Sequence, residues 1–347
     1  LAAAGIVAVG SGAAVLTTTN ATAAVAPSPV VVHTVAATEA ASTSSYWTAA
    51  RMRSAKPADV VVSPSAAKAA VAAPRADGPA GTVAGSGTAA KATSAAAPLA
   101  AYTFVKVPVS ATKKWPQRLN GKLFFTNGGT NWVCSGTSVA AASAPVQNEV
   151  WTAGHCTANT EGSKAFDTYA QFIPAYNGKG KTEKQIAPFG RFTATQYITT
   201  TAWLNNGDLS VDLGAIRVGT NAKGQTLGQA VGWDGFAWNQ SYQQQFNAFG
   251  YPAAAPYNGQ SMYRDRASTS STANVGGVGP VTLGIPNPMT GGSSGGEWAI
   301  QWNANQGASG YINGHNDFKF TNDPLTMYSP YFNSLANTVR CFGASSC

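Results

Sequence analysis

The chain has 347 residues, enough for two domains, and only 10% of them are charged, with a formal net charge of +8. Its lysines and arginines are scattered rather than clustered, so we interpret the charge as a solubility feature and expect no nucleic-acid partner. The sequence has no heptad pattern, no internal repeat and, beyond its first residues, no apolar run of membrane-spanning length. We therefore expect no stable membrane association.

The first residues are small and mostly apolar. The stretch 1–16 is apolar, and AVA at 24–26 fits a small-x-small cleavage site, with ATA at 21–23 as an equal choice. Residues 1–26 resemble a secretory signal peptide whose basic n-region is missing, which predicts a secreted, extracellular protein. A buried helix or a membrane anchor is the alternative, which the short run and its glycines disfavour.

The next segment is rich in alanine. Alanine supplies 24 of the 74 residues from 27 to 100, and Tyr46 and Trp47 are the only aromatic residues there. Such a segment has too little aromatic or branched surface to offset the entropy lost on ordering. We expect a propeptide or a flexible linker, disordered or removed in the working protein. A tether that spans a cell wall is the alternative.

From residue 101 onward the sequence is typical of a folded β protein. A C-terminal helix is expected at 330–339, and about 245 residues exceed one small barrel, so we expect an all-β fold with barrels at 101–225 and 226–347. Short apolar runs separated by Gly, Asn and Pro clusters predict strands at 122–127, 131–140, 149–154, 170–176, 189–198, 213–218, 245–252, 261–269, 297–303 and 309–315.

The chain has four cysteines, and an even number in a secreted protein predicts two disulfides. Of the three possible pairings we favour Cys134–Cys156 and Cys341–Cys347, because each closes a local loop. A zinc site at Cys156 beside His155 is the alternative, which the lack of a C-x-x-C pair disfavours. We expect no metal and no organic cofactor.

Two sequence blocks carry a candidate base and its partner. His155 follows an apolar strand in VWTAGHC, where small neighbours and a disulfide would fix its ring as a general base. Asp212 stands at the head of the apolar strand in VDLGAIRV, where a buried carboxylate can accept from the imidazole and fix its tautomer. Asp208 is a rival, but its context, NNGD, is typical of a solvated turn.

A third block, TGGSSGGEW at 290–298, places two serines between glycine pairs. Glycines let backbone approach a substrate carbonyl, and the amides of Gly292 and Ser294 could point at one developing oxyanion. We prefer Ser294 to Ser293 as the nucleophile because two glycines follow it. The α/β-hydrolase pattern G-x-S-x-G also matches, but that fold needs the order serine, acid, histidine, and the order here is histidine, aspartate, serine.

The blocks CSGTSVAAASAPVQNEVWTAGHC, VDLGAIRV and MTGGSSGGEW resemble those of chymotrypsin-fold serine peptidases, most closely the secreted bacterial trypsin-like and glutamyl-endopeptidase-like group. The resemblance covers about residues 122–332. It implies two perpendicular six-stranded antiparallel β-barrels with the active site between them, acting as a monomer on protein or peptide substrates. His155 would be the general base, Asp212 its orienter and Ser294 the nucleophile that forms an acyl-enzyme, with oxyanion amides from Gly292 and Ser294.

The chain departs from that family at several positions. Glu297 stands where relatives carry proline, Asp317 where they carry a small serine, and Asn287 where one cysteine of a further disulfide would lie. Pro288 stands where trypsin-like members carry the aspartate that reads Lys or Arg, so we expect no trypsin specificity. A catalytically inactive binding protein on this scaffold is the alternative function, which the complete triad disfavours.

Specificity is expected to come from the strand after the nucleophile. We predict that His315, Asn316 and Asp317 bind substrate, because the resemblance places this stretch along the pocket wall. His315 lies near the position where acid-specific relatives read glutamate, which suggests a preference for Glu. A histidine that is hydrogen-bonded inside the wall is the alternative.

Overall fold

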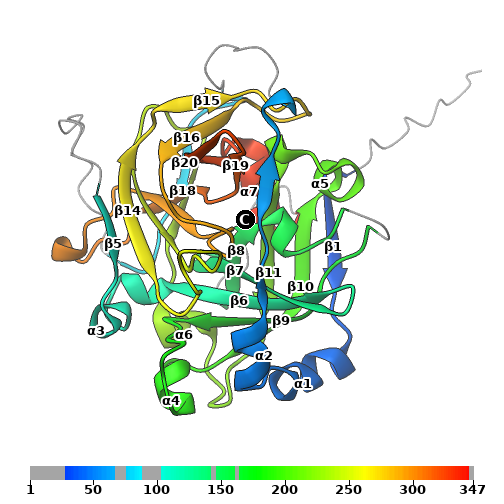
Figure 1. Cartoon of the computed structure of the whole chain (residues 1–347), viewed down its shortest axis with the longest axis vertical. Helices are drawn as coiled ribbons and strands as arrows, with labels where there is room; N and C mark the ends of the chain where they lie inside the picture. The colour runs from blue at the N-terminus through cyan, green and yellow to red at the C-terminus, as the bar shows by residue number, and fades with distance from the viewer. Residues whose placement is uncertain (1–27, 67–75, 88–102, 142–145, 161–163, 344–347) are drawn as a thin grey trace, which may run out of the picture.

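The computed structural model describes residues 28–66, 76–87, 103–141, 146–160 and 164–343. Antiparallel pairing runs from β9 through β6, β7, β8 and β11 to β10, and β10 pairs again with β9, so these strands close a barrel (Figure 1). We call it the first barrel. Its strands are β6 (Asn120–Asn127), β7 (Thr130–Val139), β8 (Glu149–Ala153), β9 (Thr168–Pro174), β10 (Phe192–Thr200) and β11 (Leu213–Val218).

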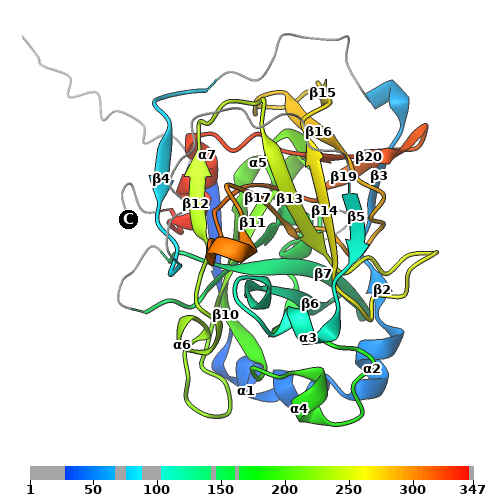
Figure 2. The same ribbon diagram turned by 90° about the vertical axis from the view of Figure 1, so that its left-hand side faces the viewer.

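The remaining strands of the C-terminal half form two further sheets, which Figure 2 shows above β6 and β7. Trp298, Phe246 and Met327 pack in a core that both sheets share. One sheet contains β12 (Gly235–Trp238), β13 (Gln245–Gly250), β14 (Tyr263–Ser268), β17 (Glu297–Ile300) and β18 (Tyr311–His315), and the other β15 (Ser271–Ala273), β16 (Thr282–Pro286), β19 (Phe318–Phe320) and β20 (Asp323–Ser329).

The helices are short, and the predicted C-terminal helix is present as α7, beginning a few residues later than expected. Among the described residues, no helix is both long enough and apolar enough to cross a membrane. The helices are α1 (Ala37–Tyr46), α2 (Ala49–Ser54), α3 (Val109–Thr112), α4 (Glu183–Ile186), α5 (Thr201–Asn206), α6 (Leu227–Val231) and α7 (Ser334–Arg340).

These elements confirm the all-β prediction, and each predicted strand overlaps a strand of the structure. The pairing is not wholly antiparallel, because β12 runs parallel to β18. The expected start of the first barrel at residue 101 differs from what is observed: β5 (Thr103–Lys106) pairs with β14 of the C-terminal half. The predicted signal peptide at 1–26 lies outside the described residues.

The alanine-rich segment was expected to be disordered, and its described parts are folded instead. Four short strands of this segment add to the sheets: β1 (Val30–Thr34) to β10, β2 (Lys56–Pro57) to β7, β3 (Val60–Val62) to β19 and β4 (Gly81–Val83) to β12. Trp47 and Met52 are buried in one cluster with Phe124 of the first barrel. The prediction failed because it counted only the apolar surface within the segment, whereas the segment buries its few large side chains against the barrel.

One stretch of this segment joins the two halves of the molecule. Residues 56–62, which we call the strap, run along the front of the molecule in Figure 1 as a blue ribbon. The start of the strap pairs in parallel with β7 at Trp132, and its end pairs in parallel with β19 at Phe320. Ala58 lies between these two pairings, so the strap crosses from the first barrel to the C-terminal half.

Candidate active site

His155 lies in a single 3₁₀ turn, η3 (Gly154–Cys156), that follows β8. The disulfide Cys134–Cys156 joins this turn to β7 across a Cα–Cα distance of 6.2 Å, which confirms the predicted pairing. The second predicted pair involves Cys347, which lies outside the described residues. The first bridge and the strand together hold the backbone of His155 in place.

Asp212 meets His155 at one end of the first barrel. Because β8 and β11 are antiparallel with Ala153 opposite Leu213, the residues just beyond these ends lie side by side. The buried Asp212 accepts two hydrogen bonds from His155, one from its amide at 2.7 Å and one from Nδ1 at 2.8 Å. A carboxylate only accepts, so Nδ1 carries a hydrogen and Nε2 is the nitrogen left for proton transfer.

The histidine is strongly basic in this setting. Burial lowers the pKa of His155, but the charge of Asp212 and its hydrogen bond, with Asp317 adding to them, outweigh burial and raise the pKa to about 10. Nε2 of His155 has no hydrogen-bond partner among the described residues. The ring is therefore oriented by Asp212 and strongly basic, and its Nε2 is free of other partners in the described part of the chain.

The turn that contains Ser294 requires its glycines. Gly292 and Gly295 have φ values of +91° and +77°, where a side chain would be strained. A Cβ on Gly295 would also lie 2.0 Å from the hydroxyl of Thr152 in the first barrel. The carbonyl of Ser294 accepts from the amide of Ser135 at 2.8 Å. The turn is thus docked onto the first barrel beside the η3 turn.

The two serines of this turn have different roles. The hydroxyl of Ser293 donates to the carbonyl of Thr290 at 2.8 Å, within the turn itself. The hydroxyl of Ser294 points out of the turn and donates to the carbonyl of Ala58 in the strap at 3.2 Å. Of the two hydroxyls, only that of Ser294 bonds to a peptide carbonyl outside the turn. A nucleophilic serine has to face away from its own turn in this way.

The carbonyl of Ala58 also accepts from the amide of Gly292 at 3.1 Å. One strap oxygen is therefore held by a predicted oxyanion donor and by the predicted nucleophile together. The amide of Ser294, the second predicted donor, has no acceptor among the described residues. The carbonyl of Ala58 therefore contacts the amide of Gly292 and the hydroxyl of Ser294, but not the amide of Ser294.

Asp317 lies against the histidine–aspartate pair rather than on an open wall. Its Oδ1 is 3.4 Å from Nδ1 of His155, and neither carboxyl oxygen has a hydrogen-bond partner among the described residues. Burial raises the pKa of Asp317 well above its usual range, and the neighbouring Asp212 raises it further. Two carboxyl groups this close do not easily ionise together, which is why, in addition to burial, Asp212 raises the pKa of Asp317.

His315 and Asn316 are fully buried, so the structure does not support the prediction that they contact substrate. Nδ1 of His315 accepts from the indole of Trp151 at 3.2 Å, and burial lowers the pKa of His315 to about 3. Asn316 donates to the carbonyls of Phe249 and Ser293 and so supports the serine turn from below. The alternative, a histidine hydrogen-bonded inside the wall, describes His315 correctly.

The other departures from the family pattern have structural partners. Asn287, which stands where relatives carry a cysteine, donates to the side chain of Asn316 at 2.9 Å and so connects this position to the segment after β18. Glu297 is buried beside Asp234, and burial with this neighbouring charge raises the pKa of Glu297 well above its usual range. Asp208, the rival of Asp212, caps the 3₁₀ turn η4 (Leu209–Val211).

Sequence reasoning missed two features of this site. The strap gave one signal, the apolar run VVV at 60–62 in an otherwise small-residue segment. Asp167, a buried carboxyl that lines a cavity beside His155, gave none, because nothing in its local sequence marks it as functional.

Solved structures of proteases match the fold of this chain. The protease Anisep from Arthrobacter nicotinovorans is 34% identical over 67% of this chain and 99% of its own, with a TM-score of 0.56. The thermostable serine protease AL20 from an extremophilic microorganism is 32% identical over 69% of this chain and 100% of its own, also with a TM-score of 0.56.

A Glu endopeptidase solved in complex with MPD shares the fold at 19% identity, covering 70% of this chain and 97% of its own, with a TM-score of 0.51. No protein-family model matches the sequence, and no curated protein matches it. The fold is that of the chymotrypsin-like serine peptidases. With its identity to Anisep and AL20 over their whole lengths, the chain belongs to the bacterial serine proteases of this fold and is a peptidase.

Proposed function

We propose that the protein is a secreted serine endopeptidase that hydrolyses peptide bonds in protein substrates through His155, Asp212 and Ser294. The observation that carries this proposal is the pair of hydrogen bonds to the carbonyl of Ala58, from the hydroxyl of Ser294 and the amide of Gly292. A nucleophile and an oxyanion donor that hold the same peptide carbonyl are what acyl transfer needs.

The chemistry follows from the geometry. Nε2 of His155 takes the proton of the Ser294 hydroxyl as the oxygen attacks the substrate carbonyl. The Asp212 carboxylate holds the ring in the required tautomer and stabilises the imidazolium that forms. The amides of Gly292 and Ser294 stabilise the oxyanion, and His155 then protonates the departing amine. Water releases the acyl group from Ser294 by the same steps in reverse order.

We also propose that the alanine-rich segment is a propeptide whose strap keeps the enzyme latent. The carbonyl of Ala58 accepts from the amide of Gly292, and the hydroxyl of Ser294 bonds to the same carbonyl rather than to His155. The strap is fixed on both sides, by the amide of Ala58 donating to Val133 at 3.0 Å and by pairing with β19. A substrate can enter only after the strap leaves.

Labelling with diisopropyl fluorophosphate tests the enzyme assignment. We expect mass spectrometry of the secreted protein to show one adduct on Ser294. Ser293→Ala is the matched control, because it changes the neighbouring hydroxyl and should still be labelled, whereas Ser294→Ala and His155→Ala should not. The same spectra report the N-terminus of the secreted form.

If a folded protein that has lost its strap takes up no label, the proposal is wrong and an inactive binding protein is the better description. If the secreted form retains residues 56–62 and turns over peptides at the full rate, the strap does not confer latency.

A further inference from the structure

A cavity of about 630 Å³ lies beside His155, between the strap and the first barrel. The strap forms one side of it, and the first barrel supplies the other side. Removal of the strap would turn this cavity into an open groove next to the general base. A peptide bound for hydrolysis must pass this groove. The first-barrel side includes Phe125, Asn127, Trp132, Asn159, Asp167 and Trp203.

One residue along the cavity, Asp167, carries a buried carboxyl group. Asp167 is only 2% exposed, and Asn127 donates to its Oδ1 at 2.6 Å. Its Oδ2 has no hydrogen-bond partner among the described residues. A buried carboxyl oxygen without a partner is costly, so native proteins rarely keep one without a functional reason.

The surroundings of Asp167 favour a cation as its ligand. Three aromatic side chains, Phe125, Trp132 and Trp203, line the same cavity, and aromatic faces attract cations. The described residues place no second and third metal-binding side chain beside Asp167, so a metal ion is a poor fit. An ammonium or guanidinium group on an aliphatic stem matches a cavity with aromatic walls and one carboxylate.

We propose that Asp167 is a specificity residue that binds a lysine or arginine side chain of the substrate next to the scissile bond. The inference rests on the proposed peptidase function and adds a subsite to it. The proposed subsite lies in the first barrel. It is separate from the pocket near Ser294, in which trypsin-like relatives bind lysine or arginine with an aspartate and this chain has Pro288 instead.

Proton binding gives the subsite a characteristic pH dependence. Burial raises the pKa of Asp167 to about 8, although the hydrogen bond from Asn127 and the charge of His155 lower it. Asp59 of the strap lines the same cavity. In the barrel interior, burial and then the charge of Asp167 raise the pKa of Tyr197. The pKa of about 8 for Asp167 holds with the strap in place, and strap release lowers this pKa because it exposes the carboxyl group to water. Since the ionised carboxylate binds the cation, preference for a basic residue should grow as the pH rises through the pKa of Asp167 in the strap-free enzyme.

Matched peptides test the proposal. Each pair of fluorogenic peptides carries lysine or norleucine, which lacks only the amino group, at one position flanking the scissile bond. For the secreted enzyme at pH 8.5 we expect kcat/KM to favour lysine by roughly tenfold at one of these positions. Asp167→Asn should bring the two peptides within about twofold of each other. Glu183→Gln, which removes a charge on the exposed helix α4, should leave the preference unchanged.

Equal rates for lysine and norleucine at every position, or an unchanged preference in Asp167→Asn, would overturn the proposal. If Asp167→Asn does not fold, the lysine-to-norleucine ratio of the strap-free wild type is followed from pH 4 to pH 9. A ratio that rises nowhere in this range overturns the proposal. If no peptide is cleaved, the binding affinities of the same peptides for Ser294→Ala, measured by calorimetry, test the subsite without catalysis. Failure of the peptidase assignment and failure of the subsite are then separate results.

Discussion

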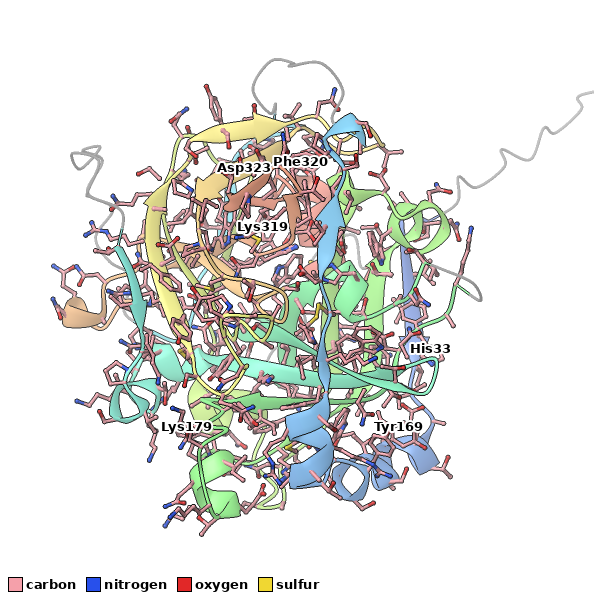
Figure 3. The ribbon with its side chains drawn as sticks, in the orientation of Figure 1. His33, Tyr169, Lys179, Lys319, Phe320 and Asp323 are labelled. Carbon is pink, nitrogen blue, oxygen red and sulfur yellow. A yellow bond between two sulfur atoms is a disulfide. The ribbon has the colours of Figure 1, made fainter. Side chains whose placement is uncertain are left out.

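Loosening the strap without touching the active site should activate the intact chain. Val62 is 7% exposed and packs with Phe318, Phe320 and Tyr328, whereas Val61, the residue before it, is 56% exposed. In Figure 3, the labelled Phe320 and Lys319 lie on β19, which pairs with these two valines. The two positions therefore form a matched pair within the strap: Val62 faces the protein core, and Val61 faces solvent.

The expected effect of Val62→Ala follows from the buried surface. Replacing valine by alanine removes two buried carbons at about 0.8 kcal/mol each, or about 1.6 kcal/mol in all. Since about 1.4 kcal/mol corresponds to a factor of ten, the population with the strap released should rise roughly 15-fold. Val61→Ala should change it by less than about twofold, because little of that side chain is buried.

The assay is the rate at which diisopropyl fluorophosphate labels Ser294, followed by mass spectrometry on chains that retain the strap. Only intact chains are counted, so self-cleavage does not contribute. We expect Val62→Ala to label roughly 15-fold faster than the wild type and Val61→Ala to match the wild type. Equal acceleration by both variants, or no acceleration by either, would refute the idea that strap release limits access to Ser294.

Three further predictions concern the buried acids and the disulfide. Asp317→Asn removes a group that raises the pKa of His155, so the acid limb of the kcat/KM profile should move to lower pH; an unmoved limb would contradict this. Glu297 and Asp234 both have raised pKa values in the folded state, so the free energy of unfolding should fall as the pH rises through those pKa values. Urea unfolding of Glu297→Gln should show a smaller difference in this free energy between pH 4 and pH 8 than the wild type shows. An equal difference in both proteins would contradict the prediction. Replacing both cysteines of the first-barrel disulfide with serine opens a loop with a sequence separation of 22 and should cost about 3 kcal/mol of unfolding free energy in the same titration, whereas a cost under about 1 kcal/mol would be unexpected.

Local patterns were enough to predict the histidine–aspartate contact. His155 and Asp212 each stand at the end of an apolar strand, and pairing of those strands brings them together. The role of His315 was misread because its sequence context does not reveal whether the ring faces the cleft or the interior. The strap was missed for another reason: its residues are ordered by pairing with β7 and β19, which lie far along the chain, and the apolar run at 60–62 does not reveal those partners.

The strap occupies two strand edges at once, and its departure would leave both edges with unpaired backbone groups. Exposed edges of this kind pair readily with any extended peptide. Maturation of the enzyme would therefore replace the strap with a substrate strand on the same edges. The backbone hydrogen bonds that first hold the strap would then become available to bind the substrate. Backbone hydrogen bonds do not distinguish one peptide sequence from another. Substrate specificity would therefore depend on the side-chain pockets beside those edges.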